Sequence, residues 1–171
     1  MRPTLEIRFS GKRIKVFAGS IRSPDGSESY REIVRHPGAV VILPVKEGKI
    51  LLIRQYRHAI GKWILELPAG TLEEKEDPEK AAQRELKEET GYEAERLTRV
   101  MSFYSSPGIS DEILHVFLAE GLREGKPSRE QGELIENLWI PLEEVLEMVR
   151  RNEIEDAKTI ATVLYYSSFL L

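Results

Sequence analysis

The stretch Gly70–Tyr92 reads GTLEEKEDPEKAAQRELKEETGY, and it predicts one helix with clear ends. Asp77 can accept hydrogen bonds from free backbone N–H groups, and Pro78 suits the first helical position. Gly91 can adopt the left-handed conformation that ends a helix. We therefore expect a helix over residues 78–90.

The side chains of this helix have an unusual distribution. At about 100° per residue, Ala81, Ala82 and Leu86 share one side, which should be buried. Glu85 and Glu89 fall among them, whereas the lysines lie on the opposite side. A pair of like charges four residues apart costs about 0.2–0.5 kcal/mol on an exposed helix, and more where water is excluded. The alternative is an ordinary solvated helix rich in Glu and Lys.

A hard divalent cation would offset the charge on the buried side. Mg²⁺ and Mn²⁺ favour carboxylate, carbonyl and water oxygens. Arg84 can pair with Glu88 at the i,i+4 spacing, which leaves Glu85 and Glu89 for the cation. The sequence therefore predicts a Mg²⁺ or Mn²⁺ site on the protein-facing side of this helix.

The residues before the helix can add a backbone ligand to this site. Ile64–Leu67 predicts a strand, and Pro68–Gly70 predicts a turn. A strand, a glycine turn and a carboxylate helix can bring a carbonyl near Ala69 to the same cation. The candidate metal ligands are therefore Ala69, Glu85 and Glu89.

The same stretch resembles the Nudix box, G-x5-E-x7-R-E-U-x-E-E-x-G-U, in which U is apolar. Every fixed position matches, through Gly70, Glu76, Arg84, Glu85, Leu86, Glu88, Glu89, Gly91 and Tyr92. Tyr at the last position is a mild departure, since aliphatic residues are commoner there. The resemblance implies an α/β fold, namely a Nudix-type α/β/α sandwich with a mixed sheet. It also implies metal-dependent hydrolysis of a diphosphate linked to another group, with Arg84 and Glu88 among the catalytic residues.

The composition narrows the remaining possibilities. The 171 residues are enough for one domain, or for one domain with a short extension, and 41% of them are hydrophobic. We expect no membrane segment and a cytoplasmic location, because no apolar run approaches 18 residues and the first residues lack a signal-peptide core. The absence of cysteine excludes disulfides, a thiolate metal site and a cysteine nucleophile. The net charge of −4 argues against a general nucleic-acid binder.

Periodicity outside the box predicts a β-rich first part and a helical last part. The expected strands cover residues 4–9, 12–20, 30–35, 39–46, 49–56, 96–103, 113–120 and 136–140, a loop covers 121–134, and helices cover 141–152 and 156–169. We divide the chain into an N-terminal β-rich extension, 1–37, and a Nudix domain, 38–171. A few short strands cannot bury a core of their own, so we expect a homodimer built through the extension. The alternative is that the extension folds back on its own domain.

Features outside the box indicate the substrate. Pro107, 15 residues after Tyr92, resembles a proline of the ADP-ribose pyrophosphatase subgroup, as do the run Leu51–Arg57 and the length of the extension. The resemblance implies ADP-ribose or a close nucleotide sugar, cleaved to AMP and ribose 5-phosphate. Guanidinium groups bind phosphate oxygens bidentately, and the candidate substrate-binding residues are Arg31, Arg54, Arg57 and Pro107. The alternative for each arginine is a surface position. Trp63 and Tyr30 could stack on adenine, although packing in a core or interface is the commoner role of such residues.

Hydrolysis also needs a carboxylate to take a proton from water. By resemblance to the subgroup, this base comes from a loop after the box, where Glu133 is the candidate and Glu130 and Glu136 are alternatives. A solvated loop charge is the alternative for each of them. Two other functions stay open: a pyrophosphatase for another nucleotide sugar or dinucleotide, and a non-catalytic Nudix module that senses ADP-ribose.

Overall fold

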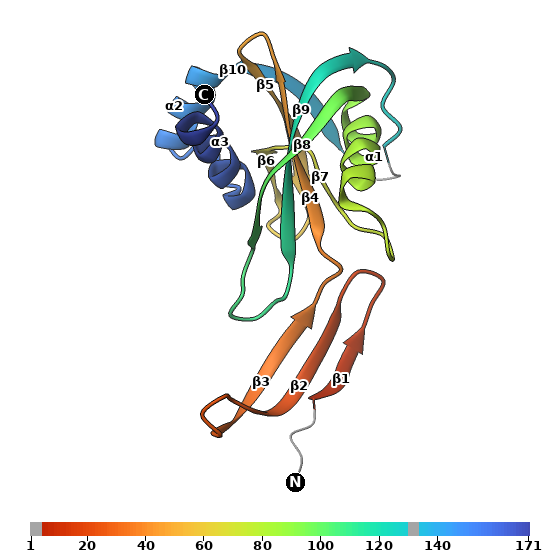
Figure 1. Ribbon diagram of the computed structural model, residues 1–171, viewed down its shortest axis with the longest axis vertical. Coiled ribbons are helices and arrows are strands. Elements are labelled where there is room, and N and C mark those ends of the chain that lie inside the picture. Colours follow the sequence, from red (N-terminus) through yellow and green to blue (C-terminus); the bar gives the residue numbers. More distant parts are fainter. Residues whose placement is uncertain (1–4, 130–133) are drawn as a thin grey trace.

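The structure is a computed structural model that describes residues 5–129 and 134–171. Within these residues, ten strands form two sheets, and three helices accompany them (Figure 1). The strands are β1 (Leu5–Ser10), β2 (Lys15–Arg22), β3 (Glu28–Arg35), β4 (Ala39–Lys46), β5 (Lys49–Arg57), β6 (Lys62–Glu66), β7 (Ala69–Thr71), β8 (Tyr92–Tyr104), β9 (Ile113–Glu124) and β10 (Ile135–Pro141). The helices are α1 (Pro78–Thr90), α2 (Leu142–Arg150) and α3 (Ala157–Phe169).

The larger sheet is mixed. Its strands lie in the order β10-β5-β4-β9-β8, with β6 paired to β5 and β7 paired to β4. The β4–β9 pair is parallel, and the others are antiparallel. The β4–β5 hairpin turns at Glu47 and Gly48, whose φ angles of 51° and 72° are those of a tight primed turn.

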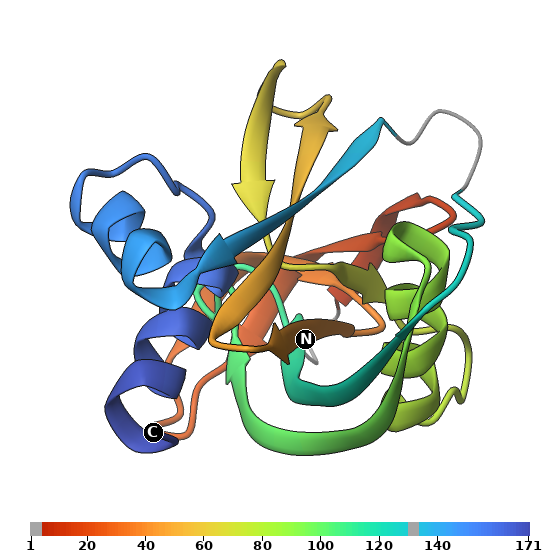
Figure 2. The ribbon, with the colours of Figure 1, turned by 90° about the horizontal axis from the view of Figure 1, so that it is seen from above.

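Helices cover both faces of this sheet. Figures 1 and 2 show α1 on one side and the pair α2 and α3 on the other. Strand β4 serves both faces because successive side chains point in opposite directions. Val41 and Leu43 belong to the core under α2 and α3, whereas Val40 and Ile42 belong to the core under α1. The predicted α/β sandwich with a mixed sheet is therefore confirmed.

Several predicted boundaries were wrong, and sheet pairing explains each difference. β9 continues to Glu124, so the predicted loop over 121–134 does not include residues 121–124. Residues 121–124 extend the hairpin with β8, where Tyr92 pairs with Glu124. The predicted turn at 68–70 is also partly wrong, since residues 69–71 form β7 against β4.

The smaller sheet has the order β1-β2-β3 and is attached to the larger one through the loop that follows β8. Val34 N donates to Ile109 O at 2.8 Å, and Arg35 Nη1 donates to Asp111 Oδ2 at 2.8 Å. His36 N donates to the other oxygen of Asp111 at 2.9 Å. Burial raises the pKa of Asp111, but the hydrogen bonds and charge of its partners outweigh burial, so the pKa is lowered. These contacts fix where the smaller sheet leaves the domain.

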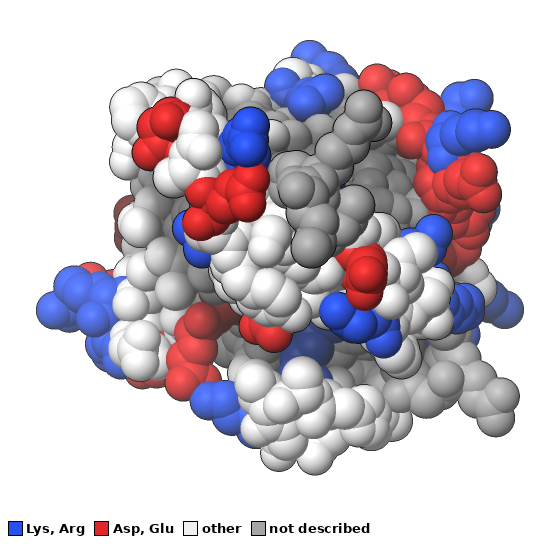
Figure 3. Space-filling model, turned by 90° about the horizontal axis from the view of Figure 1, so that it is seen from below, with Lys and Arg blue, Asp and Glu red and all other residues white. Residues whose placement is uncertain are grey.

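The surface carries charges of both signs. On the face seen from below in Figure 3, Lys and Arg side chains are interspersed with Asp and Glu side chains around the rim. Among the described residues, none of the helices has the length and apolar character needed to cross a membrane.

Candidate active site

Helix α1 has the predicted ends. The Asp77 side chain accepts hydrogen bonds from Glu79 N and Lys80 N. At the other end, Gly91 has φ 83° and donates its N–H to Lys87 O. Because both ends are fixed locally, the rotation of the helix, and with it the direction of each carboxylate, is set.

Arg84 organises three carboxylates rather than the one that its helical spacing predicts. Its guanidinium donates twice to Glu76, at 2.9 Å each, and its Nη1 donates to Glu85 at 2.7 Å and to Glu88 at 3.1 Å. The hydrogen bond from Arg84 lowers the pKa of Glu76. Hydrogen bonding to Glu76 also raises the pKa of Arg84, so the guanidinium stays charged. The network fixes the orientation of these three carboxylates.

Glu89 and Glu85 lie on the protein-facing side of α1, as the helical arrangement predicts. Glu89 is only 3% exposed, and one of its oxygens accepts a hydrogen bond from Ala69 N at 3.0 Å. Glu85 packs directly over Gly70. A Cβ added to Gly70 would lie 1.9 Å from Glu85 Cδ, so only glycine leaves room for this carboxylate.

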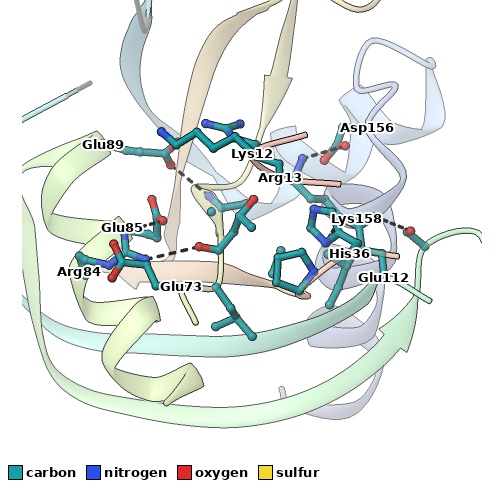
Figure 4. Close-up of a pocket in the computed structure, with 18 of the residues that line it drawn as sticks. Lys12, Arg13, His36, Glu73, Arg84, Glu85, Glu89, Glu112, Asp156 and Lys158 are labelled. Carbon is teal, nitrogen blue, oxygen red and sulfur yellow. Dashed lines mark hydrogen bonds and ion pairs between the residues drawn. The ribbon is translucent and has the colours of Figure 1, made fainter. Parts of the chain in front are cut away.

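These side chains line a cavity of about 1000 Å³. In Figure 4, Glu73, Arg84, Glu85 and Glu89 stand on the α1 side, and Asp156, Lys158 and His36 stand opposite them. The β1–β2 turn and the first residue of β2 reach the same cavity through Lys12, Arg13 and Lys15. The cavity therefore combines an acidic wall on α1 with cationic groups from the smaller sheet and from α3.

A buried ion-pair cluster lies in the wall opposite α1. Glu66, which is fully buried, accepts hydrogen bonds from Arg57 Nε and Nη2, both at 2.7 Å, and it is also paired with Lys158. Lys158 contacts Asp156 at 3.0 Å as well. Burial lowers the pKa of Arg57, but its hydrogen bonds to Glu66 and the attraction of nearby carboxylates outweigh burial, so the pKa is raised.

The donor chemistry of the acidic wall fits a hard divalent cation. In the two described ranges, 5–129 and 134–171, no group of three or more His, Cys, Asp or Glu side chains is arranged to hold a metal ion. Arg84 holds Glu85 and Glu88, so a cation at this wall would compete with that guanidinium. Glu85 and Glu89 nevertheless lie well buried beside the cavity on one helix. Carboxylate oxygens such as theirs are the ligands that Mg²⁺ and Mn²⁺ prefer.

The structure places the other candidate substrate residues outside the cavity of this chain. Arg54 contacts Glu136 at 3.3 Å, and its guanidinium lies 5.0 Å from the centre of the Trp63 ring. Arg31 is exposed on β3 and donates to Tyr30 O. Pro107 is exposed in the loop between β8 and β9. Of the four predicted substrate-binding residues, only Arg57 lines the cavity.

The two possible stacking residues differ in their surroundings. Trp63 packs edge-on against Tyr56 and under Arg54, whereas Tyr30 is 59% exposed.

Of the candidate bases, Glu133 and Glu130 lie outside the described residues. Glu136 is on β10, where it pairs with Arg54 and does not line the cavity.

Sequence reasoning missed Glu66 and Lys158. Glu66 interrupts the apolar run Ile64–Leu67, and a carboxylate in such a run signals a buried partner. Lys158 gave no comparable signal, because it meets Glu66 only through the packing of α3 against the end of β6.

Comparison with known proteins identifies the family. The sequence profile of the NUDIX domain matches residues 34–163, which is most of the chain. The chain belongs to the Nudix family. It is 48% identical over 160 residues to the ADP-ribose pyrophosphatase of Bacillus subtilis (strain 168), covering 92% of this chain and 86% of that protein. It is 42% identical over 160 residues to the methanol dehydrogenase activator of Bacillus methanolicus, with the same coverage.

A solved structure has the same fold. The crystal structure of ADP compounds hydrolase superposes with a TM-score of 0.84 at 21% identity, covering 99% of this chain and 95% of that one. The predicted family and hydrolase class are therefore confirmed. Nudix hydrolases use divalent metal ions, which agrees with the donor chemistry of the acidic wall.

Proposed function

We propose that this Nudix hydrolase cleaves the diphosphate of ADP-ribose to AMP and ribose 5-phosphate, with Mg²⁺ or Mn²⁺ as the cofactor. The observation that carries the reaction class is the set of α1 carboxylates on the wall of a large cavity, where Arg84 holds Glu85 and Glu88 and the Ala69 N–H holds Glu89. The identity to the Bacillus subtilis enzyme over 92% of the chain supports the choice of substrate.

Glu85, Glu89 and the carbonyl of Ala69 would hold the cation. When bound, the cation polarises phosphoryl oxygens and brings a water molecule closer to hydroxide. Arg84 donates hydrogen bonds to Glu85 and Glu88 and so holds both side chains at the cavity wall before a substrate binds. The water oxygen forms a bond to one phosphorus, and the bridging P–O bond breaks.

The proton released by the water needs a base. Glu133 is the proposed base by resemblance to the subgroup, and in the sequence it lies between β9 and β10. Ser128 N donates to Glu88 O at 2.9 Å, and Arg129 Nε donates to Glu89 O at 2.9 Å, so the chain just before that segment lies against the C-terminal half of α1. Glu88, which is 37% exposed and lines the cavity, is within the same network.

The other proposed substrate contacts come from a second copy of the chain. Arg31 and Pro107 do not line the cavity of their own chain, and the smaller sheet and the loop that holds Pro107 carry exposed apolar side chains: Ile7, Phe9, Tyr30 and Ile109. Apolar groups gathered around a three-stranded sheet favour a partner. The functional unit is therefore a homodimer in which the extension of residues 1–37 meets the partner's nucleotide site.

A panel of nucleotide substrates tests the proposal. The purified chain is incubated with Mg²⁺ or Mn²⁺ and with ADP-ribose, GDP-mannose, NAD⁺ or a nucleoside triphosphate, and kcat/KM is measured for each. The proposal predicts the highest value for ADP-ribose. A higher value for another nucleotide sugar would keep the reaction class and replace the substrate, whereas binding of ADP-ribose without cleavage would favour a sensing module.

A further inference from the structure

The last turn of α1 receives too few hydrogen bonds from its own stretch of chain. The final four carbonyl groups of a helix have no N–H group within the helix from which to accept. Lys87 O accepts from Gly91 N at 2.9 Å. Tyr92 N, the next donor along the chain, is bonded to Thr90 Oγ1 at 3.2 Å, and β8 begins at Tyr92. The other three carbonyls of the last turn therefore need partners from elsewhere in the molecule.

Residues that follow β9 in the sequence supply all three partners. The bonds are Ser128 N to Glu88 O at 2.9 Å, Arg129 Nε to Glu89 O at 2.9 Å, and Asn137 Nδ2 to Thr90 O at 2.8 Å. Arg129 Nη2 also donates to Asn137 Oδ1 at 3.1 Å, so these two side chains are joined to each other. In Figures 1 and 2, residues 125–129 run beside α1. Every carbonyl at this helix end is thus satisfied, three of them by residues distant in the sequence.

Gly91 allows this close approach. A Cβ added to Gly91, whose φ is 83°, would lie 2.9 Å from both Gly125 O and Pro127 N. A Cβ added to Gly125 would in turn lie 2.9 Å from Gly91 O. The two main chains therefore pack directly against each other, which holds the donors of Ser128 and Arg129 at the end of the helix.

The carbonyls held in this way belong to the turn that carries the carboxylates of the cavity. Glu89 is held at two points, because its carbonyl accepts from Arg129 and its carboxylate accepts from Ala69 N at 3.0 Å. The charge of Arg129 also suits the partial negative charge at a helix C-terminus. Neither Arg129 nor Asn137 lines the cavity, so each acts on a ligand there only through α1. Because helix ends fray, loss of Arg129 should loosen the orientation of Glu89.

We propose that Arg129, together with Asn137, is a positioning residue for the metal ligands of α1. It holds the last turn of the helix so that the carboxylate of Glu89 faces the cavity in one orientation. This inference rests on the proposed function for the assignment of Glu89 as a metal ligand, but it does not depend on ADP-ribose as the substrate. Removal of Arg129 should therefore weaken metal binding before any nucleotide is present.

The experiment is calorimetric titration of the full chain with Mn²⁺, without nucleotide. Arg129→Ala should weaken Mn²⁺ binding about tenfold, as is typical when a residue that orients a metal ligand is lost. Arg129→Lys, which keeps a cation able to donate to Glu89 O, should stay within about threefold of wild type. Arg123→Ala is the matched control, because Arg123 is an exposed arginine that pairs with Glu95 outside the cavity, and it should bind as wild type does.

Two further measurements separate positioning from general stability. Urea unfolding shows that each variant is folded during the titration, and a merely structural role would lower stability without changing the Mn²⁺ affinity of the folded protein. Hydrogen exchange should be faster in Arg129→Ala at the amides of residues 88–90 and unchanged in Arg123→Ala. Asn137→Ala, which keeps Arg129 but removes the partner of its Nη2 group, should weaken Mn²⁺ binding in the same direction.

Three results would overturn the inference. They are wild-type protein that binds no Mn²⁺, folded Arg129→Ala or Asn137→Ala that binds Mn²⁺ like wild type, and Arg129→Lys that loses as much affinity as Arg129→Ala. If the Mn²⁺ results hold and ADP-ribose is not cleaved, the positioning role stands and only the proposed substrate fails.

Discussion

At the scale of single residues, Arg84 explains how acidic groups can be gathered on the protein-facing side of a helix. It contacts Glu76, Glu85 and Glu88, so one cation offsets part of the repulsion among them. The i,i+4 rule predicts only the Glu88 contact. Glu76 comes from the turn before α1, and its direction depends on tertiary structure, which the sequence pattern does not describe.

Replacing the proposed metal ligands should separate catalysis from folding. Glu85→Gln and Glu89→Gln should each lower kcat at least about a hundredfold, because metal-held charge in the transition state is lost. Both proteins should remain folded, since each change removes one of two repelling charges. Glu79→Gln, on the exposed side of the same helix, is the matched control for steady-state kinetics. Near-normal kcat in Glu85→Gln would reject the ligand assignment.

Gly70→Ala should damage the site through sterics alone. The new Cβ would lie 1.9 Å from Glu85 Cδ, so Glu85 must move away from its position beside Arg84. We expect a loss of stability of about 1–3 kcal/mol, typical of overpacking, and a large fall in kcat. Urea unfolding provides the measurement, and Gly108→Ala is the control because no atom lies within 4 Å of its added Cβ. Equal stability of the two variants would contradict the close packing of Glu85 on Gly70.

The pKa of Glu76 gives a prediction about acid stability. Its pKa is lowered from 4.5 by Arg84, so its contribution to stability is present above pH 4.5 and is lost as the pH falls through the lowered value. The Glu76→Gln variant cannot lose this contribution, so its unfolding free energy should fall less steeply than that of wild type below pH 4.5. Urea titrations across this pH range test it, and parallel curves would show that the pair contributes nothing.

At the scale of elements, the sequence predicted the features that depend on neighbouring residues, namely the ends of a helix and the burial of a strand. The caps at Asp77 and Gly91 fixed both ends of α1, and the continuous apolar run of β4 indicated burial on both faces. The pairing of strands that are distant in the sequence was harder to predict from the sequence. β7 and the end of β9 are strands because a neighbouring strand offers hydrogen bonds, although their polar and glycine residues are typical of turns.

The buried ion pair of Glu66 and Lys158 could not be predicted from the sequence for the same reason. Glu66 and Lys158 are 92 positions apart and meet because α3 docks on the end of β6. Neither helical nor strand periodicity relates residues at such a separation. Only the isolated carboxylate in an apolar strand marked one of the two.

The smaller sheet gives a prediction about assembly. If its exposed apolar side chains bind a second copy, the full chain should be a dimer in light scattering, and a chain that begins near Pro37 should be a monomer with weakened affinity for ADP-ribose. A full-length monomer of about 20 kDa would rule out this arrangement. So would a truncated chain that keeps both the dimer and the affinity for ADP-ribose.

At the scale of the whole molecule, the fold brings opposite charges to one cavity. The larger sheet carries α1 on one face and α3 on the other, and both contribute to the cavity wall. The smaller sheet adds lysine and arginine side chains from the β1–β2 turn. The cavity is therefore lined by carboxylates of α1 on one side and by cationic side chains of the smaller sheet and α3 on the other.

The most direct test of this account is product analysis of one reaction. The purified chain is incubated with ADP-ribose and Mg²⁺, with Mn²⁺ in a parallel sample and EDTA in a third, and the products are separated by anion-exchange chromatography. The account predicts equal amounts of AMP and ribose 5-phosphate in the metal samples and intact ADP-ribose in EDTA. Robust turnover in EDTA, or intact ADP-ribose with both metals, would contradict it.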